Sequence, residues 1–145
     1  MPRHVASTLA RLAAAAALAV APAWAETLSF QADLTGASEV PAVSTSARGT
    51  LSATYDTASK RLAWIGTIAG LSGPLVAAHF HGPAEPGQNA GVLIPAPGVS
   101  SGAFEGAAVL HDPQAQALIA GQTYFNVHTA AHPNGELRGQ VVKAE

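Results

Sequence analysis

Hydrophobic and polar residues alternate along most of the chain after residue 26, with the two-residue period of a β-strand. Every second side chain is apolar in residues 27–34, and residues 47–56 and 61–69 alternate on either side of a polar turn. These last two runs predict a hairpin in which Trp64 anchors the core. The other extended runs are residues 75–81, 92–94, 103–110, 122–129 and 136–143. The pattern predicts an all-β, antiparallel Greek-key sandwich or barrel of seven or eight strands.

One segment has the signals of a short helix instead of a strand. Asp112 is the predicted N-cap, Pro113 would take the first helical position, and Gly121 suits the residue that ends a helix. We therefore expect a single short helix near residues 113–120.

The end of the chain predicts a second hairpin. Residues 121–129 and 135–143 both alternate, and Pro133, Asn134 and Gly135 between them favour a turn. The side chains expected in the core are Phe125, Val127, Leu137 and Val141. Asn126 and His128 would then lie on the opposite face.

The first 25 residues have the composition of a secretory signal peptide. Arg3 and Arg11 precede an apolar run, residues 12–20, and small residues lead up to a cleavage site after Ala25. That run is too short to cross a bilayer, and no later run reaches the required length. We expect one mature domain, residues 26–145, without a membrane span, in the periplasm or outside the cell; an uncleaved anchor is the alternative.

Cleavage would leave five basic and nine acidic residues, a net charge of about −4. The basic residues are scattered, which argues against a nucleic acid or an anionic membrane surface as the partner. The chain has no cysteine, so no disulfide stabilises it and the core alone must hold the fold.

The histidines are the only concentrated chemistry. His79 and His81 share one face of a predicted strand, and His128 lies on another. If those strands pair, the three imidazoles converge, with nitrogens within about 8 Å, and suit Zn(II) or Cu(II). His132, in the following turn, could complete the site or stay exposed.

A purely structural role for the same residues is the competing interpretation. Two histidines separated by one residue can lie on a solvated strand face, or bond to the backbone of the loop 83–91. His111 belongs to a loop or to the cap of the helix.

Signatures of conventional enzymes are absent from the sequence. It has no cysteine nucleophile, no Gly-x-Ser-x-Gly elbow, no P-loop and no dinucleotide fingerprint, and its carboxylates stand alone in separate segments. Glu136 and Arg138, two residues apart on a predicted strand, are expected to form a structural pair.

Three segments together resemble the CHRD domain family, named for chordin. They are TGASEVPAV at residues 35–43, AHFHGPA at 78–84 and YFNVHTAAHPNGELRGQ at 124–140. The departure is His132, where asparagine or a small polar residue is more usual, so a ligand role has less support there. The resemblance implies an exported all-β domain without an established activity, and an extracytoplasmic ligand or protein as its unidentified partner.

Three hypotheses follow. The first is a non-enzymatic binding module that holds Cu or Zn through the histidines. The second is a structural or adhesion module of the cell envelope, in which these histidines only make hydrogen bonds to loops. The third rests on a likeness to Cu/Zn superoxide dismutase, a Greek-key barrel with a similar copper site. This chain lacks that enzyme's cysteines and an identifiable bridging histidine.

Overall fold

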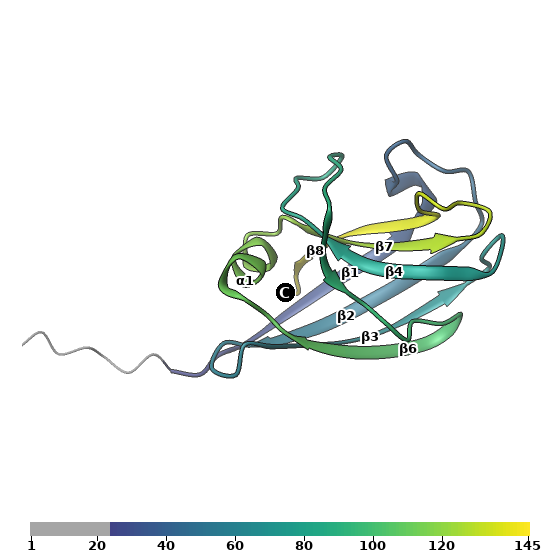
Figure 1. Ribbon diagram of the computed structural model, residues 1–145. Coiled ribbons are helices and arrows are strands. Elements are labelled where there is room, and N and C mark those ends of the chain that lie inside the picture. Colours follow the sequence, from purple (N-terminus) through teal and green to yellow (C-terminus); the bar gives the residue numbers. More distant parts are fainter. Residues whose placement is uncertain (1–23) are drawn as a thin grey trace, which may run out of the picture.

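The computed structural model describes residues 24–145, so almost all of the expected signal peptide lies outside the described residues. Eight antiparallel strands form a nearly closed barrel with one short helix (Figure 1). The strands are β1 Thr27–Thr35, β2 Arg48–Asp56, β3 Arg61–Ala69, β4 Leu75–His81, β5 Val92–Pro95, β6 Gly102–Val109, β7 Thr123–Thr129 and β8 Leu137–Lys143. The helix α1 spans Asp112–Ile119, and a 3-10 turn, η1, spans Gly36–Ser38.

The strand order is β5-β4-β7-β8-β1-β2-β3-β6, and every pairing is antiparallel. β2 pairs with β3, which confirms the hairpin predicted from residues 47–56 and 61–69. The pairs β3–β6, β4–β7 and β8–β1 join strands that are not consecutive, which is the Greek-key feature of the fold. The predicted fold class is confirmed.

The core lies between the inward faces of the strands, where the apolar members of each alternating run meet. Phe80 is fully buried at its centre, with its ring 5.1 Å from Trp64 and 4.8 Å from Phe125, both edge to face. Trp64 is 2% exposed, so its predicted role as a core residue is confirmed.

The helix begins one residue earlier than predicted, and the expected cap at Asp112 is wrong. His111 has the extended backbone of an N-cap, and its N–H donates to Oε1 of Gln114 over 2.8 Å. Asp112 is already helical, and its carboxylate accepts from Lys60 Nζ at 2.6 Å. Gly121, with φ +74°, follows the helix as predicted.

The last hairpin forms as predicted, with β7 and β8 paired from Thr123↔Val141 to Val127↔Leu137. Its four expected core residues are all buried. The opposite face is also covered, because residues 84–90 bond to side chains of β4, β7 and β8 there.

The expected pair between Glu136 and Arg138 does not form. β8 begins at Leu137, so Glu136 still belongs to the turn and its carboxylate accepts from Thr45, Thr129 and the backbone of Ser72, over 2.7 to 2.9 Å. Arg138 is bonded to the loop before β5 instead.

Replacing Phe80 by alanine tests the position of the core. Phe80→Ala should lower the free energy of unfolding by about 3–5 kcal/mol, because it leaves a cavity beside the rings of Trp64 and Phe125. Val76→Ala, on the same strand but 58% exposed, should change it by no more than about 0.5 kcal/mol. Urea denaturation of both variants measures the difference, and equal losses would contradict this core.

Candidate metal centre

The pairing of β4 with β7 brings the histidines together. In the register of the two strands His79 lies opposite Asn126, His81 opposite Tyr124, and Ala77 opposite His128. The three imidazoles therefore leave the same outer face of two neighbouring strands. The sequence predicted this convergence on the condition that these strands pair, and they do.

One ring nitrogen of each of His79, His81 and His128 lies within 4.8 Å of the others. The ring centroids are 5.2 Å apart for His79 and His128, 5.5 Å for His79 and His81, and 6.0 Å for His81 and His128. Imidazoles that share one Zn(II) have nitrogens about 3.3 Å apart, given bonds of 2.0–2.1 Å and tetrahedral angles. Small side-chain movements would close that gap, so the triad could hold a metal ion.

Backbone carbonyls fix which nitrogens are free. His81 Nδ1 lies 3.0 Å from the carbonyl of Ala90, and His128 Nδ1 lies 2.9 Å from that of Pro133. A carbonyl only accepts, so each Nδ1 donates its N–H and each Nε2 keeps its lone pair. Nε2 of His81, Nε2 of His128 and Nδ1 of His79 are buried without a hydrogen-bond partner.

Two imidazoles of the triad, those of His79 and His81, favour the uncharged form. Burial lowers the pKa of His79 below its ordinary value, and the neighbouring His128 lowers it further. Burial also lowers the pKa of His81, against the opposing effect of its hydrogen bond to Ala90. Neutral imidazole is the form that binds a metal.

The other predicted histidines lie outside the group. His132 is not among the clustered ligand atoms; its backbone N–H donates to Thr129 in the turn. The structural alternative accounts for one observation, since His81 does bond to the loop 83–91. It does not account for the three buried ring nitrogens, one from each histidine of the triad, that have no hydrogen-bond partner.

Sequence reasoning missed a buried polar layer beside the triad. Asn126 donates to the carboxylate of Glu39 and to the carbonyl of Leu137, and Glu39 is only 8% exposed. Burial raises the pKa of Glu39 to about 7, although Arg138 and the hydrogen bond from Asn126 oppose it. The one available signal was Asn126, which shares a strand face with His128.

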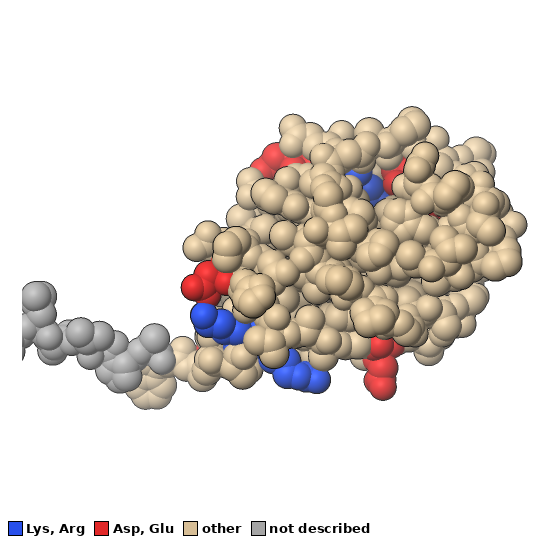
Figure 2. Space-filling model, in the orientation of Figure 1, with Lys and Arg blue, Asp and Glu red and all other residues tan. Residues whose placement is uncertain are grey.

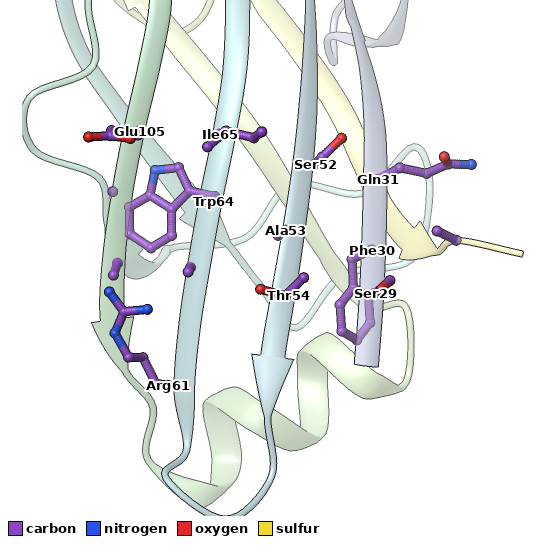
Figure 3. A pocket seen from close by; sticks show the side chains of 14 residues that line it. Ser29, Phe30, Gln31, Ser52, Ala53, Thr54, Arg61, Trp64, Ile65 and Glu105 are labelled. Atoms are coloured by element: carbon purple, nitrogen blue, oxygen red, sulfur yellow. The ribbon is translucent and has the colours of Figure 1, made fainter. Parts of the chain in front are cut away.

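One hollow lies elsewhere on the barrel. A shallow groove of about 720 Å³ lies along β1, β2, β3 and β6, and no histidine lines it. Figure 3 shows its side chains, among them Gln31, Ser52 and Glu105. The groove offers no group of metal ligands.

Residues 30–141 match the sequence model of the CHRD domain family. The chain belongs to the CHRD domain family. No curated protein and no solved structure matches it significantly. Across residues 24–145, none of the helices has the length and hydrophobicity needed to cross a membrane.

The buried carboxyl of Glu39 predicts how stability depends on pH. Its pKa is higher in the folded protein, about 7, than the ordinary 4.5, so folding favours the protonated form. Its contribution is full below pH 4.5 and is lost as the pH rises to about 7, for a total of about 3 kcal/mol. Glu39→Gln should remove this dependence and be more stable than wild type at pH 8, but not at pH 4.5.

Urea denaturation at both pH values checks this expectation. Glu105→Gln is the matched control, because that carboxylate is exposed on β6 and its loss should change stability by no more than about 0.5 kcal/mol. Parallel pH profiles for wild type and Glu39→Gln would contradict the assignment.

Proposed function

We propose that this CHRD domain is an exported, non-enzymatic binding module that holds one Zn(II) or Cu(II) ion through His79, His81 and His128. The observation that carries the proposal is the clustering of three imidazoles, with one ring nitrogen of each within 4.8 Å of the others and one buried nitrogen of each without a hydrogen-bond partner.

Such an arrangement is costly without a ligand. A buried polar atom that lacks a partner costs about 1–3 kcal/mol. Five side-chain atoms among the described residues are in this state, and three of them belong to the triad. A metal ion would satisfy all three at once.

The surroundings match those of known metal sites. A metal-binding histidine usually donates its second N–H to a carbonyl or carboxylate, which fixes the ring. His81 and His128 both do so here. Imidazole ligands favour Zn and Cu over Mg and Ca, and three of them leave a fourth position for water or a ligand.

Export and the partner are proposed from the sequence. Residues 1–25 have the order of charged, apolar and small residues that a signal peptide requires. The face drawn in Figure 2 carries only a few scattered charged side chains and no basic patch of the kind that a nucleic acid would require. An extracytoplasmic ligand or protein, in the periplasm or outside the cell, fits both features.

Metal titration tests the proposal. The metal-free domain should bind one equivalent of Zn(II) or Cu(II), and His81→Ala should weaken binding at least about tenfold. His132→Ala is the matched control and should bind like wild type. Because the pKa of His79 and of His81 is below the ordinary 6.5, affinity should persist until the pH falls below that value.

Thermal unfolding of the same samples separates binding from a structural role. Metal at 100 times its dissociation constant should add about 2.7 kcal/mol to the stability, and a chelator should remove it. If metal and chelator leave stability unchanged, the structural or adhesion module is the better interpretation.

A second candidate is a copper enzyme like superoxide dismutase. The observation that favours it is the placement of two histidines on one strand and a third on its neighbour, in a Greek-key barrel. A bound copper would cycle between two oxidation states while two superoxide ions and two protons become dioxygen and hydrogen peroxide.

An assay of superoxide consumption decides this candidate. Copper-loaded wild type should exceed both the zinc-loaded protein and copper-treated His81→Ala, since zinc has no redox chemistry. Equal rates in all three samples would rule out the copper enzyme, and the non-enzymatic binding module would remain the proposed function.

A further inference from the structure

Arg138 is a buried cation without an ion pair. It lies on β8, is 2% exposed and is the largest fully buried side chain of the described residues. The only ion pair within 4.0 Å in residues 24–145 joins Lys60 and Asp112. Burying a charge is expensive, so what Arg138 does contact indicates its role.

The guanidinium of Arg138 binds the loop before β5 and the ring of Tyr124. Nη1 donates to Oδ1 of Asn89 over 2.9 Å, and Nη2 donates to the carbonyl of Gln88 over 2.5 Å. Its Cζ lies 3.5 Å from the centroid of Tyr124, a cation–π contact. Arg138 therefore fixes residues 88–89 and the tyrosine together.

Tyr124 connects this clamp to the metal triad. The ring of His81 stacks on Tyr124 at 4.9 Å with the two planes 3° apart. Because β7 lies between β4 and β8, His81 and Arg138 approach Tyr124 from opposite neighbouring strands. The tyrosine is held from both sides.

Ala90, in the same loop, contacts both Tyr124 and His81. Its N–H and its carbonyl both lie 3.2 Å from the hydroxyl of Tyr124, and the same carbonyl accepts the Nδ1–H of His81. His81 is thus positioned twice, by the ring that stacks on it and by the carbonyl that sets its tautomer. Arg138 contacts the ring of Tyr124 directly, and it is hydrogen-bonded to the two residues before Ala90.

We propose that Arg138 is the positioning residue of the metal site: it clamps Tyr124 and residues 88–89, and these hold Ala90 and His81 so that Nε2 of His81 points at the other two imidazoles. The inference rests on the proposed metal-binding function, because it names what regulates the affinity of that same triad. Coupling of this kind is reciprocal, so metal binding must also tighten the loop.

Zn(II) affinity measured by competition with a chromophoric chelator tests the clamp. Arg138→Lys keeps the charge but loses the planar fork, and should weaken Zn(II) binding about 10–100-fold. Tyr124→Phe keeps the stacked ring but loses the hydroxyl, and should weaken it about tenfold. Gln140→Ala is the control: Gln140 lies opposite Tyr124 on β8, but its side-chain amide donates to the carbonyls of Ala84 and Gly121 and makes no hydrogen bond to Tyr124 or to residues 88–90.

Hydrogen exchange supplies a readout that a merely structural residue would not change. Zn(II) should slow exchange of the Ala90 amide in the wild-type protein and in Gln140→Ala, and should slow it less in Tyr124→Phe. This measurement holds even where Arg138→Lys does not fold, since it needs only the wild type and Tyr124→Phe.

The outcomes separate the two proposals. Unchanged affinity in Arg138→Lys and Tyr124→Phe, together with a loss in His81→Ala, overturns the role of Arg138 and leaves the metal site standing. No slowing at Ala90 on Zn(II) binding likewise overturns the coupling alone. Absence of Zn(II) and Cu(II) binding by the wild-type domain overturns both.

Discussion

Strand β7 is buried on both faces, and the candidate site depends on that double burial. Its inner face contributes Phe125 and Val127 to the apolar core. On the outer face Tyr124 and Asn126 are also buried, because other segments of the chain cover them. Polar groups that lose contact with water need partners. Asn126 finds them in Glu39 and the Leu137 carbonyl. The histidines lie at the edge of this polar layer. His81 and His128 each have one ring nitrogen with a hydrogen-bond partner and one without.

The polar layer also shapes the turn between β7 and β8. Gly135 has φ +126°, a conformation that other residues rarely adopt. A Cβ there would lie 2.5 Å from both the Asn126 amide nitrogen and a carboxylate oxygen of Glu39. Glycine is therefore required at position 135 for two reasons: the backbone conformation, and the lack of space for a side chain. The turn therefore holds the Pro133 carbonyl, and with it the ring of His128, in a defined place.

Local patterns in the sequence were sufficient to predict the strands and the three histidines that form the triad. Alternation located the strands, and its parity placed His79 and His81 on one face of their strand and His128 with Asn126 on one face of theirs. The pairing of β4 with β7 could only be assumed, because the two strands are not consecutive and their contact depends on the whole Greek key. The burial of Arg138 and Glu39 could not be predicted in this way, because charged residues are normally exposed. The wrong partner for Glu136 has a similar origin: the turn ends one residue later than the alternation suggests.

The contact between β1 and β8 makes the two ends of the domain depend on each other. Phe30, near the beginning of the domain, lies opposite Lys143, almost at its end. A chain that emerges from its N-terminus cannot complete the sheet until the final strand is available, and contacts this distant in sequence form slowly. If the chain is exported as proposed, that delay would favour transport of the polypeptide before it folds.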